Sequence, residues 1–308
     1  KAVTGSRSAE EVDSAVDAAF DSVRHVDLLM SNYRDDSEVS RINRYAAQEP
    51  VSISRETTEA IGKALELARE SDGAFDVTVL PLLEIWGFAK DREKTVPSQE
   101  QIDEKLRLVG YKLVELDRAN RKIKLEAQGV GIDLGAIGKG YAVDVAIKSL
   151  ISHGVDSAII NAGGDIYCLG GKTPGKGWRV AVTDPTTEDG LLGYVELKDK
   201  AIATSGDYRN YFIADGVRYS HILDPRTGRP SVQGPHSVTV VAGSCTYADG
   251  LSTAVFVLGR EEGLRLLEKL PDAEALIVSG DKDHLELTST TGWNQATLWE
   301  PLQRELPH

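Results

Sequence analysis

Residues 129–144 read Gly129-Val-Gly-Ile-Asp-Leu-Gly-Ala-Ile-Gly-Lys-Gly-Tyr-Ala-Val-Asp144, a short apolar run that breaks into closely spaced glycines and then continues as a helix. Asp133 lies within strand-like alternation, and helical periodicity begins at Tyr141. The N–H groups at the start of such a helix favour phosphate oxygens. The pattern therefore predicts a strand, a loop whose glycines, Gly140 among them, let the backbone approach a phosphorylated ligand, and a mobile positive charge at Lys139.

A plain strand–turn–helix connection uses the same glycines, so the ligand site has a structural alternative. A P-loop would have glycine where Asp133 stands and serine or threonine where Gly140 stands, and the spacing differs from the dinucleotide fingerprint. Both of those nucleotide-binding classes are therefore disfavoured. A carboxylate at Asp133, in an apolar strand, requires a donor or a cation to offset its desolvation.

The composition is that of a globular protein and excludes two classes of partner. The 308 residues are 41% hydrophobic and 27% charged, and no apolar run is long enough to span a bilayer. The formal net charge of −13 argues against sequence-independent binding of nucleic acid, which needs a basic surface. An acidic chain that holds an anionic ligand also needs a local cation, for which a metal ion would serve.

The elements predicted from periodicity and capping are both helical and extended. Ser8 with Glu11 and Ser98 with Gln101 form the pattern of a capping box at the start of a helix. Further segments are expected as helices (57–71, 246–258 and 261–270), as strands (157–161, 178–183, 192–197, 201–204 and 237–242) and as hairpins (112–125 and about Asp215-Gly216). With neither a repeat nor a linker, the chain is expected to form one interlocked α+β domain over residues 1–308.

The two cysteines and the start of the chain allow only simple expectations. Cys168 and Cys245 lie far apart without metal-ligand spacing, so they are expected as small buried residues and not as a disulfide. The chain starts at Lys1, and nothing before Ala9 resembles an export signal, so a leader removed by processing remains an option.

Four polar clusters lie at predicted strand ends or turns, where a fold can bring loops together. They are residues 133–139, 161–165, 204–211 with 221–228, and 249–253. Asp249 and Thr253 are four residues apart at a predicted helix start, so their oxygens would share one face and could hold a hard cation. The alternative is that Asp249 is only a favourable charge at the helix N-terminus and Thr253 a neighbour that faces the core.

His221 and two tyrosines have a chemical and a structural interpretation each. A histidine has an intrinsic pKa of about 6.5, which suits a general base near neutrality, although a lone histidine is more often structural. Tyr208 and Tyr211 could stack on a flat ring, or they could simply pack within a β-rich region.

Seven segments taken together resemble the ApbE family, the FAD:protein FMN transferases. In chain order they are Tyr33-Arg-Asp-Asp-Ser-Glu-Val-Ser-Arg-Ile-Asn43, Asp72-Gly-Ala-Phe-Asp-Val-Thr-Val79, Gly131-Ile-Asp-Leu-Gly-Ala-Ile-Gly-Lys-Gly-Tyr-Ala-Val-Asp144, Asn161-Ala-Gly-Gly-Asp165, Thr204-Ser-Gly-Asp-Tyr-Arg-Asn-Tyr211, Ser220-His-Ile-Leu-Asp-Pro-Arg-Thr-Gly228, and Ala248-Asp249 with Thr253. They follow the order of the family and cover nearly the whole chain.

The resemblance implies a fold and an activity. The fold would be a single ApbE-like (T-fold-like) domain of mixed, largely antiparallel sheets flanked by helices. The enzyme would cleave FAD, attach FMN through a phosphoester to a threonine or serine of a target flavoprotein, and release AMP. Two alternative functions would need the same glycine-rich binding loop. They are an FAD pyrophosphatase, in which water replaces the acceptor, and a flavin-binding protein without turnover.

The resemblance also implies roles for individual residues. FAD would be contacted by Tyr33, Ala74, Phe75, Asp76, Asp133, Lys139 and Ile222. The main-chain carbonyl of Ala136 would join Asp249 and Thr253 around Mg²⁺, an oxygen-only set that suits this ion and not zinc. His221 matches the histidine proposed to deprotonate the acceptor hydroxyl.

One feature departs from the family pattern. Family members usually begin with a strand that carries a Met-Gly-Thr motif whose methionine touches the flavin, and nothing before Ser8 matches it. The first strand is therefore expected to be missing. Many members are exported lipoproteins, which implies the bacterial cell envelope as the location, with the cytoplasm as the alternative.

Overall fold

The computed structural model describes residues 1–2, 8–173, 175–187, 189–208, 210–231, 235–280 and 284–302. These residues form two compact units. The described residues within 1–24, 139–206 and 234–308 make one, called here the sheet unit, and those within 25–138 and 207–233 make the other, called the helical unit. The prediction of one domain over residues 1–308 stays a prediction. The segment in which the Met-Gly-Thr motif was sought falls largely on residues 3–7, outside the described residues.

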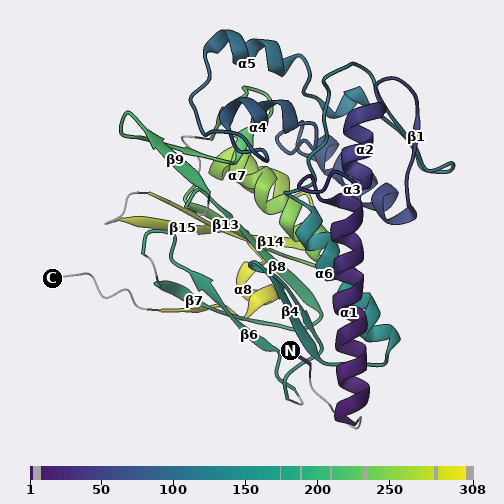
Figure 1. Cartoon of the computed structure of the whole chain (residues 1–308). Helices are drawn as coiled ribbons and strands as arrows, with labels where there is room; N and C mark the ends of the chain where they lie inside the picture. The colour runs from purple at the N-terminus through teal and green to yellow at the C-terminus, as the bar shows by residue number, and fades with distance from the viewer. Residues whose placement is uncertain are drawn as a thin grey trace. The chain divides into compact units, whose positions relative to one another are not determined.

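The sheet unit is built on an antiparallel sheet in which six strands are found among the described residues (Figure 1). Their order is β15-β14-β13-β8-β5-β4, with bounds β4 (Ala158–Ala162), β5 (Asp165–Leu169), β8 (Lys200–Gly206), β13 (Ser237–Ala242), β14 (Ala273–Gly280) and β15 (Leu285–Ser289). At the β4 edge Ala2 forms an antiparallel bridge with Ala158. A smaller antiparallel sheet joins β16 (Glu300–Pro301), β7 (Leu191–Leu197) and β6 (Trp178–Thr183).

The strand register assigns the two faces of the larger sheet. Ile202 pairs with Val241 and with Ile166, and these side chains pack with β6, β7 and Trp293 of α8 (Trp293–Thr297) in one apolar cluster. Because side chains alternate along a strand, residues an odd number of positions away point to the opposite face. Asp165, one residue from Ile166, and Ser205, three residues from Ile202, are among them. Helix α7 (Cys245–Leu267) packs on β8, β13 and β14, and the Ser205 hydroxyl contacts α7 residues Ser252 and Thr253.

Helix α7 begins and breaks for identifiable reasons. Ser244 caps it by accepting a hydrogen bond from the Tyr247 N–H. Asp144, from α6 (Gly138–Ser152), accepts hydrogen bonds from the N–H groups of Cys245 (2.7 Å) and Thr246 (2.9 Å). The helix is interrupted at Gly259, whose φ of 75° and ψ of −178° are not helical. This break agrees with the prediction of two successive helices.

The helical unit holds short helices and small sheets. Its helices are α2 (Glu38–Tyr45), α3 (Arg55–Glu70), α4 (Leu80–Trp86) and α5 (Gln99–Leu106), with a 3-10 turn η1 (Tyr111–Leu113). Its strands are β1 (Val51–Ser52), β2 (Val114–Asp117), β3 (Lys122–Leu125), β9 (Tyr211–Ala214), β10 (Val217–Ser220), β11 (Leu223–Asp224) and β12 (Arg229–Pro230). The first helix, α1 (Ala9–Met30), begins in the sheet unit and ends in the helical unit. Both predicted capping boxes are confirmed, at Ser8 and at Ser98.

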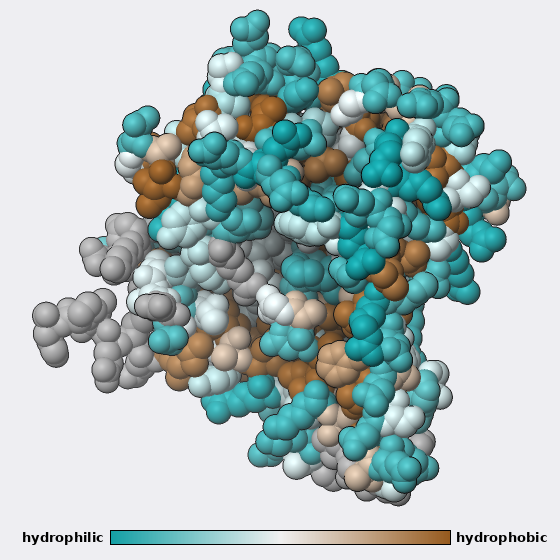
Figure 2. Space-filling model, viewed as in Figure 1, coloured by the Kyte–Doolittle hydropathy of each residue, from teal (hydrophilic) through white to brown (hydrophobic). Residues whose placement is uncertain are grey.

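The prediction of mixed helices and largely antiparallel sheets is confirmed. In the part of the chain that the structure describes, no helix is long and apolar enough to cross a membrane. The face shown in Figure 2 is covered mostly by hydrophilic residues, with apolar patches between them.

Candidate active site

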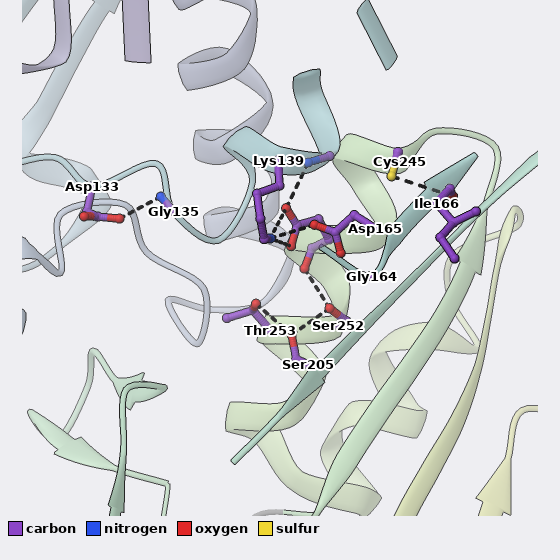
Figure 3. Close-up of polar contacts among 12 residues, drawn as sticks. Asp133, Gly135, Lys139, Gly164, Asp165, Ile166, Ser205, Cys245, Ser252 and Thr253 are labelled. Atoms are coloured by element: carbon purple, nitrogen blue, oxygen red, sulfur yellow. Dashed lines mark hydrogen bonds and ion pairs between the residues drawn. The ribbon is translucent and has the colours of Figure 1, made fainter. Parts of the chain in front are cut away.

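A lysine and two carboxylates form an ionic cluster in the sheet unit, where α6, β5 and α7 meet (Figure 3). The Lys139 Nζ lies 2.6 Å from an Asp165 oxygen and 3.2 Å from both Asp249 oxygens. The Lys139 side chain is 48% exposed, whereas the side chains of Asp165 and Asp249 are 4% and 5% exposed. The prediction of a mobile charge at Lys139 is therefore wrong, because two buried carboxylates hold its ammonium in place.

The charges in this cluster shift each other's pKa values. Burial opposes the Lys139 ammonium, but the Asp249 and Asp165 carboxylates outweigh it and raise the pKa of Lys139 above its ordinary value. Burial, and next the Asp165 carboxylate, raise the pKa of Asp249, while Lys139 and the Gly140 N–H act in the opposite direction. Asp249 and Asp165 thus share one ammonium, and the pKa of Asp249 stays above its ordinary value despite it.

Gly140 explains how closely α6 and α7 approach each other. Its N–H donates to Asp249 at 3.1 Å, and a Cβ atom added at Gly140 would lie 2.3 Å from the carbonyl oxygen of Cys245. The prediction that this glycine makes room for a ligand needs correction: its missing side chain makes room for the backbone of α7.

Hydroxyl groups continue the cluster along α7. Thr253 follows Asp249 by one helical turn, and its hydroxyl lies 3.1 Å from that of Ser205, which also contacts Ser252 at 2.8 Å (Figure 3). Because α7 begins at Cys245, Asp249 is in the second turn and buried, which corrects the prediction of a helix start and disfavours a simple N-terminal charge. No group of three His, Cys, Asp or Glu side chains that could hold a metal ion occurs among the described residues. Any cation here would need hydroxyl or carbonyl oxygens beside Asp249.

Asp133 lies in the helical unit and has the donors that its burial requires. Asn32 donates its side-chain amide to one carboxylate oxygen at 2.7 Å, and the Gly135 N–H donates to the other at 2.7 Å (Figure 3 draws the second bond). Asn43 holds the neighbouring peptide of Ile132 with two hydrogen bonds, of 2.7 and 2.9 Å. The predicted strand around Asp133 is wrong, because only an isolated bridge from Gly131 forms there. The segment is held by asparagine side chains together with one backbone hydrogen bond, from the Asp133 N–H to the Val77 carbonyl at 2.7 Å.

Two of the residues predicted to contact FAD line the same pocket of the helical unit. This pocket has a volume of about 370 Å³, and its walls include Tyr33, Asp133, Arg44, Phe88 and Arg92. Tyr33 is 69% exposed, so its ring is available to a ligand. The pocket combines aromatic rings with two guanidinium groups, the ammonium of Lys90 and two carboxylates, of Asp133 and Glu84, a set that suits a polar and partly aromatic ligand.

The three residues of the 74–76 turn lie below the surface. Ala74 and Phe75 are buried, and the Asp76 carboxylate accepts hydrogen bonds from the Thr78 hydroxyl, the Thr78 N–H and the Tyr111 N–H, at 2.6, 2.8 and 2.5 Å. Burial raises the pKa of Asp76, and these hydrogen bonds oppose that shift. Asp76 therefore organises the turn, and direct contact of these three residues with FAD stays a prediction.

His221 follows the β9–β10 hairpin directly. Its backbone N–H donates to the Asn210 carbonyl at 3.0 Å, and its Nδ1 lies 3.0 Å from the same oxygen. The ring also meets Phe88 edge to face, with 6.4 Å between centroids. In a neutral ring Nδ1 then carries the hydrogen and Nε2 the basic lone pair. The adjacent Ile222 is buried at 6% exposure.

Tyr211 packs within its own hairpin, whereas the role of Tyr208 stays a prediction. The Tyr211 ring stacks under the Arg218 guanidinium at 4.6 Å, which favours the packing alternative for this residue. Beside the hairpin, the Trp86 indole N–H donates to the Gly228 carbonyl at 2.8 Å and fixes the turn that follows Asp224.

The structure brings one or two residues of each predicted cluster together within the sheet unit, where Lys139, Asp165, Ser205, Asp249 and Thr253 are neighbours. Asp133 and residues 221–228 belong to the helical unit. Ala136, predicted as a carbonyl ligand, belongs to the helical unit, and its role stays a prediction.

Residue pattern alone assigned no role to Asn32 or Asn43, and it named Asp165 and Ser205 only as members of the polar clusters 161–165 and 204–211. A signal existed for Asp165, because it follows two glycines at the start of a strand. Nothing in the sequence pairs the asparagines with residue 132.

The fold matches solved structures of ApbE proteins. The ApbE protein of Thermotoga maritima superposes with a TM-score of 0.84 at 38% identity, over 92% of this chain and 91% of that one. The flavin transferase ApbE of Vibrio cholerae gives a TM-score of 0.83 at 33% identity, over 94% and 91%.

Sequence comparison specifies the family. The ApbE family model matches residues 3–277. An FAD:protein FMN transferase of Vibrio cholerae serotype O1 is 38% identical over 271 residues, which cover 87% of this chain and 80% of the relative. One from Treponema pallidum is 34% identical over 295 residues, covering 91% and 81%. The chain belongs to the ApbE family.

Proposed function

We propose that the protein transfers the FMN part of FAD to a threonine or serine hydroxyl of a target flavoprotein and releases AMP. The observation that carries this proposal is the cluster of Lys139, Asp165 and Asp249 beside the start of α6, together with family membership. An ammonium group beside the positive end of a helix dipole is suited to a substrate whose reacting centre is a pyrophosphate. The acidic chain, of net charge −13, makes such local compensation necessary.

The residues fit a Mg²⁺ ion as part of this site. Asp249 and Thr253 supply a carboxylate and a hydroxyl oxygen one turn apart on α7, and oxygen donors are those that Mg²⁺ prefers. Ser205, 3.1 Å from the Thr253 hydroxyl, is placed to orient it. When bound, the ion would screen the negative charge that develops on the phosphate oxygens.

His221 has the proton-transfer role in this proposal. The acceptor hydroxyl oxygen forms a bond to the FMN phosphorus, the bond from that phosphorus to the AMP oxygen breaks, and the hydroxyl proton moves to His221. The Asn210 carbonyl holds Nδ1, so Nε2 receives the proton. The side chain is only partly buried, as a base that meets a protein substrate must be.

The test is incubation with FAD, Mg²⁺ and a candidate acceptor domain, followed by intact mass spectrometry of the acceptor. A mass gain equal to FMN, with AMP released, supports the proposal. FMN and AMP formed without modification of the acceptor would identify a pyrophosphatase. Tight binding of FAD without any product would identify a flavin-binding protein, and either of these results would overturn the transferase assignment.

We also propose the bacterial cell envelope as the location, with the family resemblance as its support. Fractionation of the source cells, with an antibody against this chain, tests the location. Recovery in the cytoplasmic fraction alone would contradict it.

A further inference from the structure

Asp165 is delivered to the ionic cluster by the turn that precedes it. Gly163 and Gly164 have φ values of 64° and 105°, which favour glycine, and Asp165 then starts β5 opposite Ala162. The strand register points its side chain to the face of the sheet on which α7 packs. The residue is 3% exposed, and its carboxylate lies 2.6 Å from the Lys139 Nζ.

The Lys139 ammonium needs a second carboxylate if Asp249 binds a cation. A divalent cation on Asp249 would sit beside the Lys139 ammonium, and like charges repel strongly at a site with little water. The Asp249 carboxylate is 3.2 Å from Lys139, whereas Asp165 is closer, at 2.6 Å. Asp165 is thus the group that can keep Lys139 when Asp249 turns to a cation.

We propose that Asp165 is a positioning residue that holds the Lys139 ammonium, so that Lys139 and a divalent cation occupy the site together. The inference rests on the proposed cation site at Asp249 and Thr253 and adds a residue to it. Without the Asp165 charge, Lys139 has Asp249 as its remaining carboxylate in the cluster, and its ammonium then competes with the cation for that carboxylate.

The experiment is a titration of the full chain with Mn²⁺, with FAD present and without acceptor. Electron paramagnetic resonance of the free aquo ion reports binding independently of turnover. Four proteins are compared: wild type, Asp165→Asn, Lys139→Met and the double variant. Asp165→Asn is expected to weaken Mn²⁺ binding about tenfold, the size of one lost charge-assisted interaction. In the Lys139→Met background the same change is expected to alter Mn²⁺ affinity by less than about twofold.

Other outcomes separate the explanations. An equal or larger loss in the Lys139→Met background would overturn the proposal, because Asp165 would then act on the cation directly or through its charge alone. Unchanged affinity in Asp165→Asn would also overturn it. If wild type binds no Mn²⁺ while FAD is bound, the proposed cation site itself fails. Asp165→Ser is the second variant if Asn is not tolerated, and loss of the folded state in both would make Asp165 a structural anchor and overturn the proposal.

Discussion

At the scale of single residues, the fixed orientation of His221 leads to the first prediction. The Asn210 carbonyl and the edge-to-face contact with Phe88 set the ring before any substrate arrives. We expect His221→Ala to lower the rate of FMN transfer by about 10²- to 10⁴-fold, the usual contribution of a positioned base. The affinity for FAD, measured by flavin fluorescence with EDTA present, is expected to change by less than about threefold, since the variant removes a proton acceptor.

The matched control is His153→Ala, which removes an exposed histidine at the end of α6. It should transfer FMN at the wild-type rate. Transfer by His221→Ala at the wild-type rate would remove the base role, and equal losses in both variants would point to a general effect on the fold.

The two cysteines lead to a prediction about reactivity. Both are buried free thiols, as expected from the sequence. Burial raises the pKa of Cys168 to about 12 and also raises that of Cys245. At pH 8 a thiol with a pKa of about 12 is about 10⁻⁴ thiolate, and the thiolate is the reactive form.

We therefore expect a colorimetric disulfide reagent to leave both thiols of the native protein unmodified over an hour, and to modify both after denaturation. Ser152→Cys, at an exposed position near the end of α6, is the positive control. Rapid modification of a native wild-type thiol would show that the helix or sheet around it opens readily.

At the scale of elements, Asp144 joins α6 to the start of α7. Its carboxylate, 8% exposed, accepts from two backbone N–H groups and from the Thr246 hydroxyl. Asp144→Ala would leave these buried donors without an acceptor, so we expect it to lower the free energy of unfolding by about 3 kcal/mol. Urea denaturation measures the loss. The control is Asp13→Ala, at an exposed position of α1, whose free energy of unfolding should stay within about 0.5 kcal/mol of wild type. A similarly small loss for Asp144→Ala would contradict the role of Asp144 in linking α6 to α7.

The contrast between local and long-range contacts shows which part of the fold the sequence could predict. Capping boxes and runs of β-branched residues are local signals, so the helices after Ser8 and Ser98 and the strand 237–242 are found in the expected places. The predicted strand around Asp133 is wrong because the backbone pairing there stops at an isolated bridge and one further hydrogen bond, and the side chains of Asn32 and Asn43 supply other contacts. The purpose of Gly140 was missed for a related reason: its neighbour Cys245 is distant in sequence, and only packing brings it near.

The candidate site likewise contains residues that the sequence marked and partners that only the fold brings to them. Residue type and spacing marked Lys139, Asp249 and Thr253, whose chemistry is visible in the sequence. The partners that restrain them, Asp165 and Ser205, come from other strands, and strand register decides which of their side chains face α7. Local pattern therefore marks the groups that react, while long-range pairing decides how they are held.

At the scale of the whole molecule, net charge governs how FAD arrives. The protein carries a formal charge of −13 and FAD is an anion, so at long range the two repel each other. The attraction of Lys139 acts only close to the site. We therefore expect the association rate of FAD, measured by stopped-flow fluorescence with EDTA present, to rise about two- to threefold between about 20 mM and about 200 mM NaCl as the repulsion is screened. Sucrose at matched osmolality should not raise the rate, because it does not screen charge. A rate that falls with salt would mean that a local basic surface, such as that of Arg44 and Arg92 in the pocket wall, steers the ligand more strongly than the net charge repels it.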